Sequence, residues 1–197
     1  MKPFLTLKYG NPSSMHKFGG QVRHDIDKAR EQAASLIGAS PEEIIFTGCG
    51  TESDNSAIIS ALQVDKKKRH IVTTVVEHEA VLLLCKKLEE QGYEVTYLNL
   101  DNTGQISLKE LQEAVRDDTA VVSMMYANNE TGIVFPIEKA GEIIKQKGTA
   151  IFHCDAVQAV GKLPIDLSNS SIDMLSFSGH KLHAPKGVGG LYVSKGV

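Results

Sequence analysis

A regular alternation of helix-like and strand-like segments is the feature that most constrains how this chain can fold. Between Val22 and Leu36, apolar residues recur at spacings of four and three, which predicts an amphipathic helix over about 19–37. That apolar stripe consists of Val22, Ile26, Ala29, Ala33 and Leu36. Further helices are expected at about 51–63, 79–91, 107–116 and 136–147. β-branched or apolar runs predict strands at 44–47 (short and buried), 71–76, 95–98, 120–125, 149–152, 174–177 and 190–193. The alternation predicts an α/β fold with three layers (αβα), in which helices cover both faces of a mostly parallel, mixed sheet.

Capping signals stand at several of the expected helix ends. Ser107 with Glu110 resembles a capping box, and Pro136 suits the first position of a helix. Gly92 and Gly148 suit positions just after a helix, where the chain often needs a positive φ. These local signals agree with the boundaries that the periodicity gives.

Composition and charge exclude several classes of protein. The chain is 42% hydrophobic and 23% charged, which is typical of a globular protein rather than a disordered one. Its net charge is −3, so no excess of positive charge favours binding to nucleic acid or to an anionic membrane. The basic run at 66–69 has no interleaved aromatic residues and is interpreted as a solvated loop.

Length and apolar patterning bound the domain organisation. At 197 residues the chain fits one large domain, or one domain with an appendage. We expect an N-terminal segment at 1–18 and a domain at 19–197. No apolar stretch reaches membrane-spanning length and no signal-peptide pattern is present. The expected location is therefore the cytoplasm.

The cysteine and histidine residues do not indicate a disulfide framework or a metal site. Cys49, Cys85 and Cys154 are too few and too scattered for either, and a reducing compartment suits them. His180 and His183 lie close together in the sequence, but no third ligand is spaced to join them. No metal is therefore expected.

Polar clusters follow five of the expected strands. In parallel sheets, ligands bind beyond the carboxyl ends of the strands. That rule places the loops after positions 46, 76, 125, 152 and 177 on one edge of the sheet. The candidate functional residues all fall in these loops.

Two of these loops together indicate a site for pyridoxal 5′-phosphate (PLP). Ser178-Gly179-His180-Lys181 combines donors for a phosphate with an amine that can form a Schiff base, and we expect that amine to be partly desolvated. Asp155 supplies a carboxylate able to hold a protonated pyridine nitrogen. The ordinary alternatives are a solvated lysine and an aspartate that caps the next turn.

The loop at 46–53 runs from a strand through glycines into a helix. Free N–H groups and the helix dipole at such an N-terminus attract a phosphate dianion, and Thr51 adds a hydroxyl. The sequence is neither a Walker loop nor a Gly-x-Gly-x-x-Gly fingerprint, and a plain strand-to-helix turn is the alternative. Cys49 in this loop can be a nucleophile, but a small buried residue is the favoured interpretation.

The remaining loops add an imidazole and side-chain amides. His78 can stack on a pyridine ring and move protons near neutral pH, although a histidine that caps a helix is the alternative. Asn128 and Asn129 can donate to a phenolate oxygen, as can Gln158. For either Asn alone, a turn is the ordinary explanation. Five such loops in this order are more specific than any one of them.

Six segments of the chain resemble cysteine desulfurases, which are fold-type I, PLP-dependent enzymes of the class V aminotransferase family. The matching segments are 10–16, 46–55, 77–78, 128–132, 155–162 and 178–187. The resemblance covers nearly all of the chain. The stretches 129–136 and 180–187 are most similar to the nitrogen-fixation (NifS-like) branch.

The resemblance implies a role for each candidate residue. Lys181 forms the internal aldimine, Asp155 pairs with the ring nitrogen, and His78 stacks on the ring and relays protons. Asn129 and Gln158 reach the ring hydroxyl. The phosphate is held by four residues from two loops: Gly50, Thr51, Ser178 and His180. Lys181 and His78 are thus the catalytic candidates.

The resemblance also implies an activity, and it leaves alternatives open. A homodimeric desulfurase converts L-cysteine to L-alanine and passes sulfur as a persulfide to an enzyme cysteine, for delivery to an iron–sulfur scaffold or another acceptor. Members of the family are about twice as long, and their acceptor cysteine and substrate-binding arginine lie in a later domain. We therefore expect a fragment or a truncated form without the C-terminal small domain. The alternatives are a non-catalytic PLP-binding or interaction module and another class V enzyme such as selenocysteine lyase.

Overall fold

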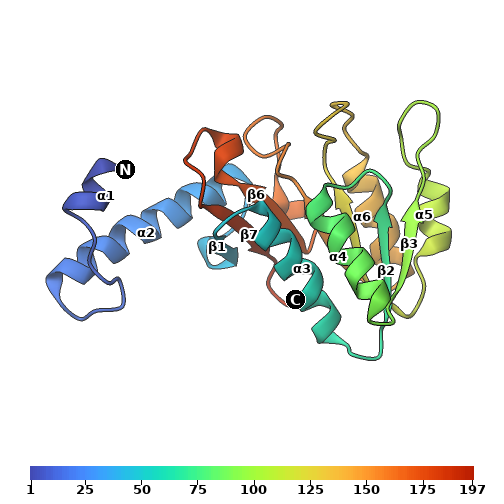
Figure 1. The fold of residues 1–197 in the computed structure, drawn as a ribbon, viewed down its shortest axis with the longest axis horizontal. Helices are drawn as coiled ribbons and strands as arrows, with labels where there is room; N and C mark the ends of the chain where they lie inside the picture. The colour runs from blue at the N-terminus through green and yellow to red at the C-terminus, as the bar shows by residue number, and fades with distance from the viewer.

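A computed structural model describes residues 1–197, and one seven-stranded sheet forms its centre (Figure 1). The strands are β1 (Ile44–Thr47), β2 (His70–Thr74), β3 (Glu94–Leu98), β4 (Thr119–Met125), β5 (Ile151–Asp155), β6 (Met174–Ser178) and β7 (Gly189–Val193). The α-helices are α1 (Lys2–Thr6), α2 (Lys17–Leu36), α3 (Gly50–Val64), α4 (Glu79–Glu90), α5 (Leu108–Ala114) and α6 (Ile137–Lys147). Short 3-10 helices are η1 (Pro41–Glu43), η2 (Leu167–Asn169) and η3 (Gly179–Leu182). All the predicted strands and helices are present.

The sheet is mixed and mostly parallel, as predicted. Its strand order is β1-β7-β6-β5-β4-β2-β3, and only β7 runs antiparallel to its neighbours. The short connection after β6 contains no crossover helix, so β7 returns beside β6 in the opposite direction. There Gly190 leaves room for the Phe177 ring, because a Cβ at Gly190 would lie 2.1 Å from its Cζ. The carboxyl ends of β1, β2, β4, β5 and β6 therefore meet at one edge.

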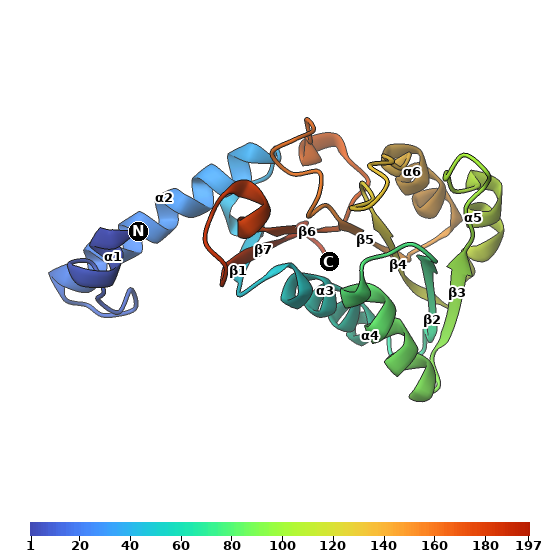
Figure 2. The ribbon, with the colours of Figure 1, turned by 45° about the horizontal axis from the view of Figure 1, so that its top comes forward.

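Helices cover both faces of the sheet, which gives the three predicted layers (Figure 2). On one face, α3 and α4 pack in a core of 13 buried apolar residues that includes Ile58 and Val81. On the other face, α5, α6 and the end of α2 contribute to a core of 26 buried apolar residues, which includes the fully buried Phe152. Burying a side chain the size of Phe152 stabilises the fold by about 1.5–3 kcal/mol.

The N-terminal region projects away from the sheet (Figure 1). The short helix α1, which the periodicity did not predict, contains no buried residue. Along α2 the predicted apolar stripe is only partly covered: Val22 is buried, whereas Leu36 is 48% exposed. The sheet begins only after this helix, at β1.

Several predicted boundaries and one predicted environment were wrong. The strand β1 is only partly buried, since Ile44 belongs to the core but Ile45 is 50% exposed at the edge of the sheet. The strand β2 ends at Thr74, because the Thr74 hydroxyl accepts from the Val76 N–H and turns the chain. Pro136 is not the first helical residue but precedes α6, with a non-helical ψ of 61°. The strand β5 starts at Ile151 rather than at 149.

The structure also shows whether a helix could cross a membrane, how the cysteines are placed and whether side chains cluster as metal ligands. No helix combines the length and apolar character that crossing a membrane requires. Cys49, Cys85 and Cys154 are all free thiols. Cys85 and Cys154 are buried, but Cys49 is exposed, so its predicted burial was wrong. No group of three potential ligand side chains is arranged to hold a metal ion.

Candidate active site

A cavity of about 260 Å³ opens at the edge where the carboxyl ends of the parallel strands meet. Its walls contain all nine residues proposed from the sequence: Gly50, Thr51, His78, Asn129, Asp155, Gln158, Ser178, His180 and Lys181. Five residues outside that set complete the lining: Cys49, Asp54, Met125, Ala127 and Val157. The fold thus brings together side chains from five separate loops.

The loop before α3 forms one wall of the cavity. Gly50 is the first residue of α3, so the N–H groups of its first turn have no partners within the helix. A Cβ at Gly50 would lie 2.9 Å from Val157 and 3.3 Å from Ser178, so only glycine allows this close approach. Glu52 holds the loop by accepting from the Gly48 N–H at 2.6 Å. A helix N-terminus is therefore fixed against the ends of β5 and β6.

The end of β6 and the residues after it form the adjoining wall. The Ser178 hydroxyl lies 2.8 Å from Nδ1 of His180, and Ser178 is buried while His180 is exposed. Lys181 is half-buried, as expected, and its amine makes no hydrogen bond or ion pair. The unpaired Lys181 amine therefore lies on the cavity wall with the Ser178 hydroxyl and the His180 ring.

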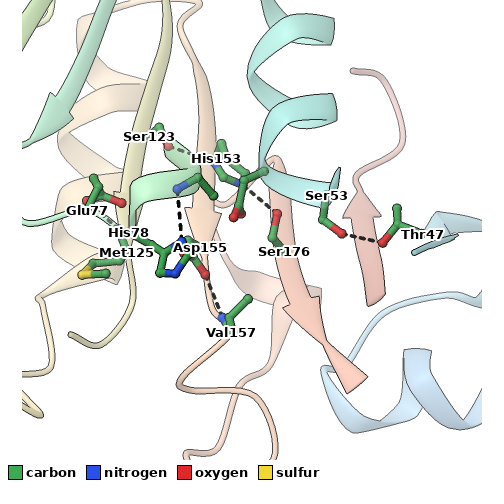
Figure 3. Close-up of polar contacts among 12 residues, drawn as sticks. Thr47, Ser53, Glu77, His78, Ser123, Met125, His153, Asp155, Val157 and Ser176 are labelled. Atoms are coloured by element: carbon green, nitrogen blue, oxygen red, sulfur yellow. Dashed lines mark hydrogen bonds and ion pairs between the residues drawn. The ribbon is translucent and has the colours of Figure 1, made fainter. Parts of the chain in front are cut away.

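Asp155 closes the cavity floor at the end of β5, beside His78 (Figure 3). One of its oxygens, Oδ1, accepts from the Val157 N–H at 2.9 Å, so the predicted turn cap is present. The same carboxyl lines the cavity and is buried. Burial raises the pKa of Asp155, while the Val157 N–H and the neighbouring His78 act in the opposite direction. Asp155 therefore caps the turn that follows β5 and also faces the cavity.

His78 likewise serves two purposes. Its Nδ1 accepts from the Ala80 N–H at 3.1 Å, which caps α4. In the neutral ring this places the proton on Nε2. The residue also lines the cavity, where a ring can stack against it. The cap fixes the ring that faces the site.

The two adjacent asparagines have different roles. Asn128 is a turn residue, because its Oδ1 accepts from the N–H groups of Glu130 and Thr131 at 3.0 and 2.9 Å. Asn129 makes no such bond and lines the cavity. Gln158 also lines the cavity while its Oε1 accepts from Lys162 at 3.2 Å. The structure therefore separates the turn residue from the candidate ligand residue.

Beneath the cavity lies a buried polar group that the sequence reasoning missed. His153, in the middle of β5, lies 2.9 Å from the hydroxyls of both Ser123 and Ser176 (Figure 3). Asp54 on α3 is 3.6 Å from Nε2 of this ring. Glu77 is buried in the turn after β2, where its Oε1 accepts from the Met125 N–H at 3.0 Å.

Burial controls the charges of these groups. Burial lowers the pKa of His153 to about 3, so the ring is neutral near pH 7. Burial raises the pKa of Glu77 to about 8, against the hydrogen bonds from Thr74 and Met125. Burial, and then the charge of Asp155, raise the pKa of Asp54 well above its usual range. Burial thus disfavours the ionised form of each of the three carboxyl groups in and beneath the cavity, Asp54, Glu77 and Asp155.

Comparisons with known proteins agree with the fold. The whole chain, residues 1–197, matches the family described as aminotransferase class-V. It is 62% identical over 197 residues to cysteine desulfurase 2 of Trichormus variabilis, covering 100% of this chain and 49% of that protein. It is 54% identical to cysteine desulfurase NifS of Azotobacter vinelandii, again over 100% of this chain and 49% of the relative.

Solved structures give the same result. A NifS-like protein superposes with a TM-score of 0.96 at 44% identity, covering 100% of this chain and 54% of that one. The structure called SspA in complex with cysteine superposes at 0.92, with 41% identity over 98% of this chain and 55% of that chain. The chain spans about half the length of the curated relatives it matches. By sequence and by structure, this chain belongs to the class-V aminotransferase family.

Proposed function

We propose that this chain is the cofactor-binding half of a PLP-dependent cysteine desulfurase. The observation that carries the proposal is the convergence of the nine candidate residues on one cavity, with the Lys181 amine and the Asp155 carboxylate both on its walls. The similarity to cysteine desulfurases along the whole chain supports the same assignment.

The donor set fits the proposed cofactor. A phosphate needs several N–H or O–H donors in a concave site, which the start of α3, Thr51 and Ser178 supply. The absent side chain at Gly50 keeps that cradle open against Val157. The opposite requirement, an anion for a ring nitrogen, is met by Asp155.

Each residue then has a defined task. Lys181 attaches the cofactor through its amine, and Asp155 keeps the ring nitrogen protonated. His78 stacks on the ring and moves protons through Nε2, while Asn129 and Gln158 reach the ring hydroxyl. When bound, PLP supplies the electron sink that lets bonds at the substrate α-carbon and β-carbon break.

The proposed substrate is L-cysteine, which leaves as L-alanine after its sulfur has passed to a thiol acceptor as a persulfide. A solved relative that carries the printed description "in complex with cysteine" supports this choice. Of the three thiols, only Cys49 reaches the cavity. We propose that the acceptor cysteine lies in the later half that the relatives possess, and that an iron–sulfur scaffold, in nitrogen fixation or a related pathway, receives the sulfur.

The cofactor assignment is tested by chemical trapping. The purified chain is incubated with PLP, reduced with borohydride, digested and analysed by mass spectrometry. We expect the pyridoxyl label on Lys181 and its loss in Lys181→Ala. Lys186→Ala is the matched control, because Lys186 is an exposed lysine five residues away. A label on another lysine contradicts the assignment.

The activity is tested separately by measuring alanine release from L-cysteine with a thiol acceptor, using the chain alone and joined to the later half of a relative. We expect turnover in the joined protein. Binding of PLP without turnover in either form favours a non-catalytic module. Faster turnover of selenocysteine favours a selenocysteine lyase.

We also propose a homodimer in a reducing cytoplasm. Large apolar side chains are exposed in the projecting N-terminal segment, including Leu5 at 73%, Tyr9 at 71% and Met15 at 100%. Such a patch is typical of an interface, and the three free thiols suit a reducing compartment. Light scattering tests the dimer, and a monomer at micromolar concentration contradicts it.

A further inference from the structure

A second carboxyl group, Asp54, shares the cavity with Asp155. It projects from the first turns of α3, is only 2% exposed and lines the cavity wall. Its Oδ1 is buried and has no hydrogen-bond partner. A buried, ionised carboxylate without partners is costly, so this group needs either a cation or a proton.

The nearest basic side chain cannot supply that charge. Nε2 of His153 is 3.6 Å from Asp54 Oδ1, but both ring nitrogens already lie 2.9 Å from a hydroxyl, of Ser123 and of Ser176. The ring is fully buried, and burial lowers its pKa to about 3. His153 is therefore neutral, and the contact with Asp54 is not an ion pair.

The other groups that face Asp54 are mostly acids. Beside burial, the pKa of Asp54 is raised by Asp155 of β5, by Glu77 in the turn after β2 and by Cys49, the residue before α3. The Ser176 hydroxyl of β6 also faces Asp54 and acts in the opposite direction. The basic groups on the cavity wall are His78, His180 and Lys181. Asp54 and Asp155 are both buried and line the same cavity, and two buried carboxylates there repel each other, so one of them keeps a proton.

Geometry decides which carboxyl keeps it. Asp155 accepts from the Val157 N–H at 2.9 Å, and His78 lies nearby, so its anion has partners. Asp54 Oδ1 has none. We propose that Asp54 and Asp155 carry one negative charge between them in the cofactor-free protein, with the proton on Asp54, so that Asp54 sets the charge presented to the cofactor's ring nitrogen. This inference rests on the proposed cofactor site, and it makes Asp54 a positioning residue.

The shared proton has a consequence for binding. A protonated pyridine ring beside Asp155 brings a positive charge close to Asp54, which favours its ionisation. PLP binding therefore releases protons from Asp54, and a reaction that releases protons strengthens as the pH rises. In Asp54→Asn the side chain has the same shape and stays neutral, so this contribution is lost.

The first test uses the cofactor-free protein. Because the folded-state pKa of Asp54 lies above the unfolded value, its contribution to stability is complete below about pH 4 and declines as the pH rises through the folded value. Urea unfolding of Asp54→Asn between pH 5 and 8 should show a flatter decline than the wild type. Should that variant not fold, Asp155→Asn removes the same repulsion and must flatten the decline too.

The second test measures the PLP dissociation constant at pH 6 and pH 8, without borohydride, so that binding stays reversible. We expect the wild type to gain about threefold more affinity than Asp54→Asn over this range. Protons of PLP itself titrate equally in both proteins, so the difference isolates Asp54. Identical pH profiles of stability and of binding would overturn the inference. Failure of both proteins to bind PLP refutes the proposed function instead, and the unfolding profiles still decide the carboxyl pair.

Discussion

His70 and His153 are both fully buried, and each connects three neighbouring strands through two hydroxyl groups. Nδ1 of His70 lies 2.8 Å from the Thr119 hydroxyl of β4, and Nε2 lies 2.8 Å from the Thr96 hydroxyl of β3. His153 makes the equivalent contacts with β4 and β6 at 2.9 Å. In both cases an imidazole satisfies hydroxyls that would otherwise be buried without partners.

The two bridges differ in their surroundings. His70 is the first residue of β2, at the amino end of the strand, and the charged groups around it are the exposed side chains of Arg116, Glu94 and Asp118. His153 lies two residues before Asp155 and 3.6 Å from Asp54, under the cavity. The same local device is thus structural at one edge of the sheet and supports a candidate site at the other. Position relative to the carboxyl ends of the strands makes the difference.

The largest effect is expected for His153→Leu. It leaves the hydroxyls of Ser123 and Ser176 buried without a partner, at about 1–3 kcal/mol each, so the free energy of unfolding should fall by about 2–5 kcal/mol. The end of β5 then loses its support, and PLP affinity should fall at least about fivefold. Urea unfolding and a PLP titration measure the two quantities. If the PLP affinity did not change, the His153 bridge would be structural only, like the His70 bridge.

His70→Leu should lower only the stability. The hydroxyls of Thr119 and Thr96 lose their partner, and the expected loss is again about 2–5 kcal/mol. No cavity residue contacts this bridge, so the PLP dissociation constant should stay within about twofold of the wild type. The same two measurements apply. A matching loss of affinity in this variant would mean that the site responds to sheet stability in general, and the comparison would fail.

Much of the fold could be predicted because periodicity shows which segments form helices and which form strands, although it placed several of their ends wrongly. It does not reveal where a strand stands in the sheet. The apolar run Ile44-Ile45-Phe46 predicted a buried strand, yet β1 is an edge strand with Phe46 37% exposed. An apolar run in the sequence has the same pattern whether a neighbouring strand or a long side chain covers it in the fold. Here Arg30 lies over the Phe46 ring, 4.8 Å from its centre.

The site was predictable for a different reason. Its nine candidate residues lie at or just after the carboxyl ends of strands, and in a parallel sheet those ends meet at one edge whatever the strand order. Asp54 and His153 lie inside regular elements, where a single polar residue is easily interpreted as solvent-exposed. A histidine within the apolar run of β5, with serines at 123 and 176 in the adjoining strands, was the available signal. Recognising it required the strand order, which only the structure provides.

The pH dependence of stability should also differ between the two histidines, by less than the effects of the substitutions themselves. The pKa of His153 is about 3 in the folded protein and near 6.5 when unfolded, so the unfolded state binds the extra proton first. Stability is therefore complete above about pH 6.5 and declines as the pH falls, by about 2 kcal/mol at pH 5 from this group. Urea unfolding at pH 7 and pH 5 should show a shallower decline in His153→Leu. Burial, and then the charge of Arg116, also lower the pKa of His70, but Asp118 and Glu94 oppose them, so His70→Leu should change the decline less.

The smallest effect is expected at the surface beside His70. Arg116 donates to both Glu94 oxygens at 2.7 and 2.8 Å and to Asp118 at 2.9 Å. All three side chains are substantially exposed, so water and salt weaken these ion pairs. Arg116→Gln should lower the melting temperature by about 1–3 °C in dilute buffer, and the difference should vanish near 1 M salt. Lys109→Gln is the control, since its exposed pair with Glu113 spans 3.8 Å and should contribute nothing measurable. A salt-resistant loss in Arg116→Gln would mean that the charges act on the buried His70 bridge itself, because screening reaches surface pairs far more readily than buried ones.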